Sequence, residues 1–192
     1  MDKNRLEAFS DGVIAIIITI MVLELKVPHG SELADLQPLL PAFLSYVLSF
    51  IYVGIYWNNH HHLLHTISHV TGGLLWANLH LLFWLSLIPF TTGWMGENHF
   101  STLPLALYGV ILLMCAFAWK LLQACMVAMQ GRNSALALAV GRDLKGRISP
   151  IFYLFGIITA FFNGYLSEAA YVLGALMWLV PDRRFEKATP AP

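Results

Sequence analysis

The histidines of this sequence are concentrated in one segment, where their spacing could support two kinds of chemistry. Six of the eight lie between positions 60 and 80. His61 and His65, or His65 and His69, are four residues apart, so each pair would share one helix face and could bind a transition metal. Histidine also titrates near neutral pH, which would suit a pH sensor. A membrane di-iron enzyme would need several separated histidine groups. We therefore predict no resident metal or cofactor, and keep His61, His65 and His69 as an alternative ligand set.

Other polar residues lie within apolar segments, and we predict that they form a structural network. Ser10 and Asp11 lead directly into the apolar residues 12–25. Polar groups buried in a membrane must hydrogen-bond to one another, because lipid offers no partner. We expect hydrogen bonds to Ser10, Asp11 and nearby carbonyls from the following residues: Asn58, Asn59, His60 or His61, Asn78 and His80.

The first apolar segment must position these residues. Asn4 and Glu7 have the spacing of a capping box, which predicts a helix over 5–25 that is about 31 Å long. This length matches a bilayer core of about 30 Å and puts Asp11 inside the membrane. Ile16, Ile20 and Leu23 would share one face, with Thr19 at its edge. Such a stripe also arises by chance in an apolar helix. Glu24 would lie near the outer end, as an interfacial acid or a cation-attracting group.

Composition places the chain among integral membrane proteins. Of its 192 residues 58% are hydrophobic and 11% are charged, against about 25% charged in soluble domains. No room remains for a soluble catalytic domain, so we predict that the chain is not an enzyme. The equal numbers of basic and acidic residues, 11 each, argue against nucleic acid as a partner. Cys115 and Cys125 lie in one apolar segment and suggest neither disulfides nor a zinc site. The first segment lacks a signal-peptide cleavage site, and we expect it to be retained.

We predict an all-α membrane fold with six spanning helices. They should cover 5–25, 39–62, 73–94 with a kink at Pro89, 104–129, 148–162 and 165–180. The last two are short, and a re-entrant hairpin would give the same pattern. A basic connection, 131–147, should be partly helical over 135–140. The domain would occupy 1–187, followed by a short tail at 188–192.

Charge predicts the orientation of these spans. With both termini in the cytoplasm, nine of the eleven basic residues face inward: Lys3, Arg5, Arg132, Arg142, Lys145, Arg147, Arg183, Arg184 and Lys187. Only Lys26 lies outside, and Lys120 can extend from its span towards the inner face. This distribution obeys the positive-inside rule. We therefore expect a multi-pass membrane protein with both termini in the cytoplasm.

Three motifs resemble those of the endosomal and lysosomal potassium channel family. They are Arg5-x-x-x-Phe9-Ser10-Asp11, Trp57-Asn58-Asn59-His60-His61, and Trp76-x-Asn78-Leu79 followed by Pro89-Phe90-x-Thr92. The match covers about the first hundred residues. Animal members carry two six-helix units, whereas this chain has a single Phe-Ser-Asp and so resembles the bacterial single-repeat branch.

The resemblance implies a homotetrameric cation channel whose pore is lined by the first helix of each subunit. No Thr-Val-Gly-Tyr-Gly filter occurs in this sequence. The residues that match the family's constriction are Ile16, Ile20 and Leu23, with Thr19 as a polar ring. The residues implied to hold the pore helices in place are Arg5, Phe9, Ser10, Asp11, Trp57, His60, His61, Asn78 and His80. His62, His65 and His69 have no place in the family pattern.

The function expected from this resemblance is potassium permeation with modest selectivity over sodium. The expected partners are other copies of the chain, monovalent cations and the lipid bilayer. Two alternatives remain. One is a membrane metalloprotein or metal transporter built on the histidine cluster, and the other is a proton channel through the same pore.

Overall fold

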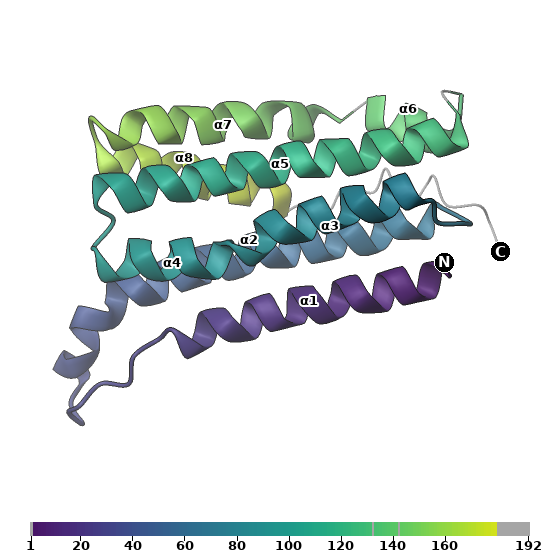
Figure 1. The fold of residues 1–192 in the computed structure, drawn as a ribbon. Coiled ribbons are helices and arrows are strands. Elements are labelled where there is room, and N and C mark those ends of the chain that lie inside the picture. Colours follow the sequence, from purple (N-terminus) through teal and green to yellow (C-terminus); the bar gives the residue numbers. More distant parts are fainter. Residues whose placement is uncertain (1, 132, 142, 180–192) are drawn as a thin grey trace.

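The computed structural model describes residues 2–131, 133–141 and 143–179, which are almost entirely helical (Figure 1). Its elements are α1 Lys3–Leu23, the 3-10 helix η1 Leu33–Leu39, α2 Leu40–His65, α3 Gly72–Ser86, α4 Ile88–Glu97, α5 Thr102–Gln130, α6 Ala135–Gly141, α7 Leu144–Ala160 and α8 Gly164–Leu179. Long apolar segments become helices in a membrane because a helix satisfies its own backbone hydrogen bonds. The predicted all-α fold is confirmed.

Four segments of the described chain are long and apolar enough to cross a membrane. They are Lys3–Leu23, Leu33–His65, Gly72–Glu97 and Thr102–Gln130. The last two predicted spans correspond to α7 and α8, which have 17 and 16 residues. At 1.5 Å per residue each is about 24–26 Å long, so both are shorter than the other four.

Two helix boundaries differ in detail from the sequence-based expectation. The side chain of Asp2 caps α1 by accepting a hydrogen bond from the Asn4 backbone, with a distance of 3.3 Å. The predicted cap at Asn4 is therefore wrong, since Asn4 lies inside the helix. The expected kink in the third segment is a break between α3 and α4 at Leu87. Pro89 lies in the first turn of α4, where a missing backbone donor is tolerated.

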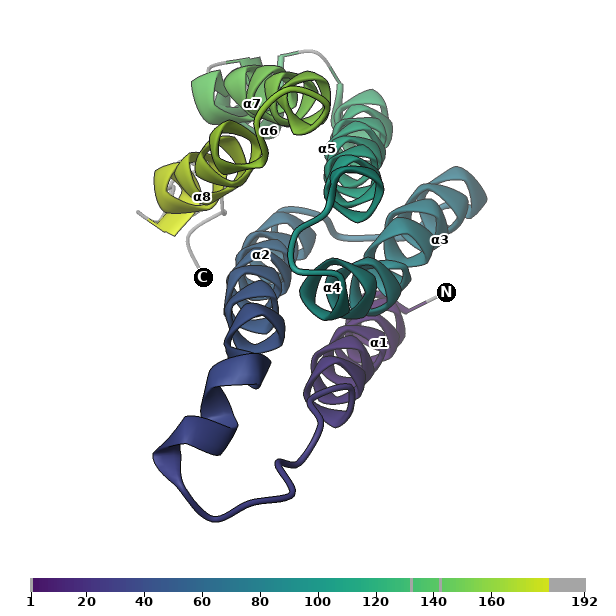
Figure 2. The same cartoon turned by 90° about the vertical axis from the view of Figure 1, so that its left-hand side faces the viewer.

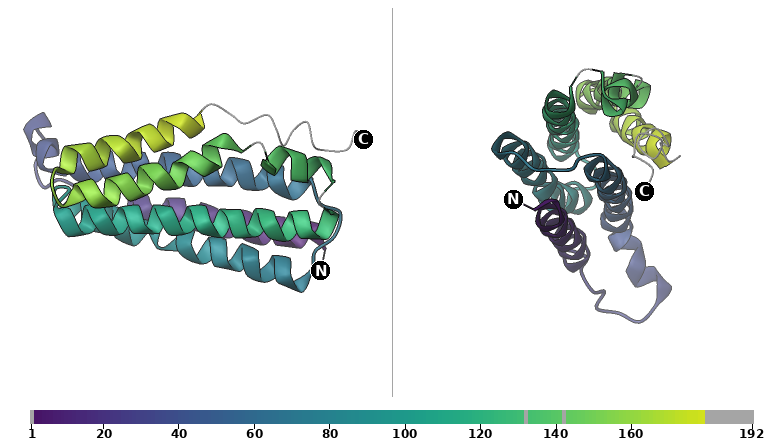
Figure 3. Two further views of the ribbon diagram at one scale, coloured as in Figure 1. Left: turned by 90° about the horizontal axis from the view of Figure 1, so that it is seen from above. Right: turned by 90° about the vertical axis from the view of Figure 1, so that its right-hand side faces the viewer.

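The bundle has two hydrophobic cores that share α2 and α5. One core joins these helices to α1 and α3, and the other joins them mainly to α4, α7 and α8. Figure 2 shows the helices end on, with α1 and the α7–α8 pair on opposite sides of the bundle. In Figure 3, α7 and α8 lie side by side and run in opposite directions. Helix α1 thus lies at the edge of the bundle.

Buried tyrosines link the helices that pack against α5 by hydrogen bonds to backbone carbonyls. Tyr52 donates to the carbonyl of Tyr171 at 2.6 Å, and the hydroxyl of Tyr171 donates to the carbonyl of Leu105 at 3.2 Å. Gly109 leaves room for this ring, because a Cβ there would lie 2.0 Å from the Tyr171 hydroxyl oxygen. These contacts satisfy polar groups inside the subunit, where lipid could not.

The described basic residues lie mostly at one end of the bundle. Lys3 and Arg5 lie at the start of α1, and α7 begins in the same half of the bundle, set back from that end (Figure 1). At the other end the Lys26 Nζ lies 2.6 Å from a Glu97 carboxylate oxygen, and this hydrogen bond raises the pKa of Lys26. Parts of the charge and domain predictions lie outside the described residues, namely Arg132, Arg142, Arg183, Arg184, Lys187 and the tail at 188–192. The orientation stays a prediction.

Candidate functional site

Helix α1 has one face packed against the rest of the bundle and one face free. The buried residues recur every three or four positions, as expected for a helix packed along one side: Leu6, Ser10, Ile14, Ile17 and Met21. The other face exposes large aliphatic side chains. Ile16 is 58% exposed, Ile20 is 41% exposed and Leu23 is 80% exposed. The predicted constriction residues therefore lie on the free face of α1.

Thr19 and Phe9 lie on the same free face. The Thr19 hydroxyl donates to the carbonyl of Ile16 at 2.9 Å, which satisfies its donor within the helix and leaves the oxygen able to accept another bond. Phe9 is also exposed. Ile16 and Ile20 border a groove whose other wall is α4, and Glu24 and Glu97 also line this groove. The C-terminal half of α1 therefore combines an apolar wall with nearby carboxylates.

A chain of buried hydrogen bonds fixes the packed face of α1. The Ser10 hydroxyl donates to the carbonyl of Leu6 at 2.8 Å and accepts from the Asn78 amide at 2.9 Å. The Asn78 carbonyl oxygen lies 2.7 Å from His60 Nε2. Because that oxygen can only accept, His60 must carry its proton on Nε2. This chain joins α1, α2 and α3.

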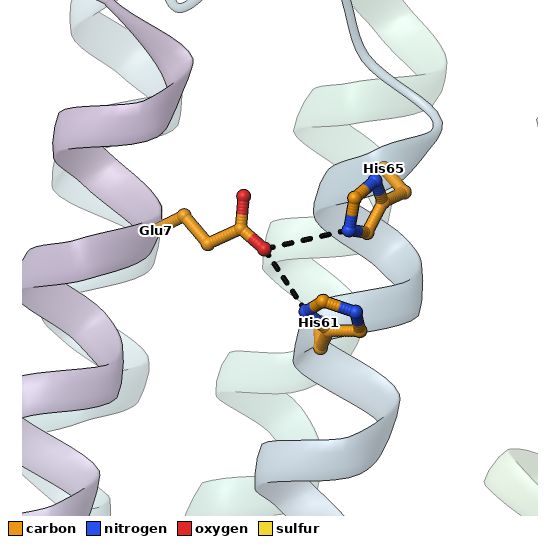
Figure 4. Close-up of side chains that lie close together, drawn as sticks. All are labelled: Glu7, His61 and His65. Carbon is orange, nitrogen blue, oxygen red and sulfur yellow. Dashed lines mark ion pairs between the residues drawn. The ribbon is translucent and has the colours of Figure 1, made fainter.

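A second set of polar contacts follows the seam between α1 and α2. Trp57 Nε1 donates to Asp11 Oδ1 at 3.1 Å. One turn away, Glu7 Oε1 lies 2.9 Å from His61 Nδ1 and 3.5 Å from His65 Nε2 (Figure 4). The helices run antiparallel, so successive turns of one meet successive turns of the other. The cytoplasmic half of α1, as predicted from charge, is thus held by polar contacts.

Three residues of the predicted sets lie elsewhere. His80 is exposed and accepts from Trp84 Nε1 of its own helix at 3.3 Å, so the predicted contact with Ser10 or Asp11 is not formed. Arg5 is exposed and has no ion pair or hydrogen bond within the described chain. His69 lies next to Ser68, with 3.3 Å between Nδ1 and the hydroxyl oxygen. It is not part of the Glu7 cluster.

Glu7 is the site residue that the sequence-based prediction assigned only to a helix cap. The sequence did contain a clue to the position of Glu7, which lies one helical turn before Asp11. If α1 and α2 pack antiparallel, these two carboxylates face successive turns of α2. The structure places one oxygen of the Glu7 carboxylate 2.9 Å from His61 Nδ1 and 3.5 Å from His65 Nε2, so two imidazoles of α2 face this carboxylate.

Comparisons with known proteins agree with this arrangement. The sequence model of the endosomal/lysosomal potassium channel TMEM175 family matches residues 5–89, which cover α1 from Arg5 onwards and all of α2 and α3. A potassium channel of Chryseobacterium sp. (strain P1-3) is 58% identical over 188 residues, which are 98% of this chain and 98% of that protein. The endosomal/lysosomal proton channel TMEM175 of Gallus gallus is 37% identical over 83 residues, covering 37% of this chain and 17% of that protein.

A solved structure extends the likeness to nearly the whole fold. The crystal structure of a lysosomal potassium-selective channel TMEM175 homolog from Chamaesiphon minutus has a TM-score of 0.81 and 26% sequence identity, over 93% of this chain and 96% of that chain. These relatives are channels and not enzymes. From the extent of the match to the Chryseobacterium protein, we conclude that the chain belongs to the endosomal/lysosomal potassium channel TMEM175 family.

Proposed function

We propose that this protein is a potassium-permeable cation channel of the bacterial inner membrane, a homotetramer with α1 of each subunit lining the pore. The observation that carries the proposal is the free aliphatic face of α1, on a helix whose other face is fixed by buried hydrogen bonds. One such helix cannot enclose a pore, whereas copies around a closed symmetry axis can. The Chryseobacterium relative is named a potassium channel and the Chamaesiphon relative a potassium-selective channel homolog, which supports potassium as the ion.

The constriction would consist of rings of Ile16, Ile20 and Leu23, with Thr19 as a polar ring between them. A narrow aliphatic neck expels water and so closes to ions, and widening or rotation of α1 lets water return. Selectivity then reflects the free energy of removing water from the ion at the neck. Potassium is held less tightly by water than sodium, so it passes with a modest advantage.

Glu24 would act at the outer mouth of this pore. It is exposed just after the last turn of α1 and lines the same groove as Ile20 and Glu97. Carboxylates at a pore entrance raise the local concentration of cations without binding them tightly. Glu24→Gln should therefore lower conductance at low salt and have little effect at high salt, where charges are screened.

Proton conduction through the same pore is the second candidate. The specific observation in its favour is that animal relatives, including the Gallus gallus protein, carry the name proton channel. Reversal potentials separate the two functions. If potassium carries the current, the reversal potential follows the potassium gradient at constant pH. If protons carry it, the reversal potential follows the pH gradient.

The experiment that tests the proposal is ion flux from proteoliposomes that contain the purified tetramer. Wild-type protein should pass potassium faster than sodium. Ile16→Asn places an amide in the neck, so it should raise the flux several-fold and reduce the potassium-to-sodium ratio. Val22→Asn is the matched control, because Val22 is also exposed on α1 but lies about 120° around the helix from Ile16.

Two results would contradict the proposal. Equal effects of Ile16→Asn and Val22→Asn would remove the stripe from the constriction. Absence of potassium flux from folded, tetrameric wild-type protein would remove the channel function itself. Cross-linking before reconstitution establishes the number of subunits, so that a failure of assembly is not mistaken for a closed pore.

A further inference from the structure

We propose that Glu7, His61 and His65 form a binding site for a divalent transition metal, with zinc as the best fit. The site lies at the end of the seam between α1 and α2 (Figure 4). Zinc binding at this site does not require the protein to conduct ions. Only the expected effect of zinc on potassium flux rests on the proposed function.

The distances between the ligand atoms suit a metal ion. Each residue offers one such atom, and all three atoms lie within 4.8 Å of one another. Glu7 Oε1 is 2.9 Å from His61 Nδ1 and 3.5 Å from His65 Nε2. Zinc–ligand bonds of about 2.0–2.1 Å at tetrahedral angles put neighbouring ligand atoms about 3.3 Å apart. An ion could therefore enter with small side-chain rotations and no movement of the backbone.

The chemistry of the ligand set also fits. Two imidazoles and one carboxylate are a set that zinc accepts, with water in the fourth position. The two histidines lie on successive turns of α2, and their rings are 4.4 Å apart. This i, i+4 pair supplies two ligands from one rigid helix, and Glu7 supplies the third from another helix.

The three side chains differ in exposure to solvent, which keeps the carboxylate fixed and leaves the imidazoles accessible to an ion. The Glu7 side chain is only 17% exposed, whereas those of His61 and His65 are 43% and 44% exposed. The carboxylate is held in place by packing between α1 and α2. The imidazoles remain open to solvent, which supplies an entry path for the ion and room for a water ligand.

A bound metal would tie the first turns of α1 to α2. In the described chain, this end of the seam otherwise has the Trp57–Asp11 hydrogen bond one turn away. If rotation of α1 widens the pore, a metal bridge at Glu7 opposes that rotation. Zinc is therefore expected to reduce potassium flux, which is the part of the inference that depends on the proposed function.

The test is zinc binding to the purified full-length protein after treatment with a chelator, measured by titration calorimetry. We expect one zinc ion per chain. His61→Gln together with His65→Gln should abolish it. Glu7→Gln should weaken it by more than about tenfold, because loss of a ligand exceeds the loss of an outer-shell partner. Cobalt in place of zinc should give the intense visible absorption of a tetrahedral site.

The matched control is His62→Gln together with His69→Gln. It removes the same number of imidazoles from the same region, and neither residue belongs to the cluster. This control should bind zinc like wild type. Equal binding by both double variants would overturn the proposal, and so would an absence of zinc binding to wild type. Glu7→Gln keeps the test decisive if the His61 and His65 double variant fails to fold.

Flux measurements separate the two proposals. Zinc should slow potassium flux through wild type and the His62 and His69 control, and leave the His61 and His65 double variant unaffected. Specific zinc binding by a protein that passes no potassium would support the metal site and remove the channel proposal. Potassium flux from a protein that binds no zinc would support the channel proposal and overturn the metal site.

Discussion

Helices α1 and α5 each contain a long and equally apolar window, yet the two helices differ in how deeply they are buried. Their most apolar windows have the same mean hydropathy, but 28% of the α1 window is buried in the subunit against 61% for α5. Helix α5 packs against neighbours on several sides and carries both cores. Helix α1 is held along one face, where polar contacts supply part of its attachment. Apolarity alone therefore does not distinguish a core helix from a helix that keeps one face free.

The largest expected difference between these helices is at their glycines. A Cβ at Gly109 of α5 would lie 2.0 Å from the Tyr171 hydroxyl oxygen and 2.7 Å from Ile157, whereas a Cβ at Gly12 of α1 would meet nothing within 4 Å. Gly109→Ala should destabilise the subunit by about 3 kcal/mol through overpacking and a weakened Tyr171 hydrogen bond. Gly12→Ala should leave stability unchanged or raise it. Thermal unfolding of the two variants in detergent measures both effects, and equal melting temperatures would contradict the comparison.

The next largest effect should come from Asn78, the residue that joins α1 to α2 and α3. Asn78→Leu leaves the buried His60 Nε2 without its acceptor and removes the donor to Ser10. We expect a loss of about 2 kcal/mol, which is a fall of about 4–8 °C in Tm. His80→Leu is the control, because His80 is exposed on the same helix and should change Tm little. A similar fall in both variants would show that the network does not fix α1.

A smaller effect is expected at Trp57. Trp57→Phe keeps an aromatic ring but removes the donor to Asp11, and Trp57 is about half exposed. The expected loss is about 0.5–1 kcal/mol. Hydrogen exchange of the first turns of α1 should increase, with no increase in α5. Faster exchange in both helices would argue against a local role for this contact.

The smallest effect should be at the Lys26–Glu97 pair, which lies at the opposite end of the bundle. Both side chains are exposed, and surface pairs of this kind contribute little. Glu97 raises the pKa of Lys26 in the folded state, so any stabilisation is complete below the ordinary lysine pKa of 10.5 and is lost as the pH rises through the raised value. Glu97→Gln should leave Tm unchanged near neutral pH. A clear fall in Tm would mean that this pair fixes the outer loop.

The sequence predicted the spans because lipid imposes a strong length and hydropathy requirement. It could not set the register between helices. The pairing of Glu7 with His61 and His65 depends on how far α1 slides along α2, which side-chain packing decides. Similarly, Asp2 and Asn4 both suit a helix cap, and two residues of difference lie within the error of any sequence pattern.

His80 was predictable in retrospect. It lies two residues after Asn78, which is about 200° around a helix, so the two side chains cannot both face α1. The free face of α1 could not be identified from apolarity, since Ile14 and Ile17 are buried and Ile16 and Ile20 are exposed in one uniform apolar run. Only the motif around Phe9, Ser10 and Asp11 indicated which residues would face which way.

The seam between α1 and α2 is nearly repetitive. Its acids are four residues apart on α1, at Glu7 and Asp11, and their partners are four residues apart on α2, at Trp57, His61 and His65. A slip of α1 by one turn, about 5.4 Å, towards its own N-terminus would therefore bring Asp11 opposite His61 and leave Glu7 opposite His65. The contact between Ser10 and Asn78 has no such repeat, since a slip would put an apolar residue opposite the amide. The repeat along the seam therefore gives α1 a small number of discrete positions relative to α2. The hydrogen bond between Ser10 and Asn78 selects one of them.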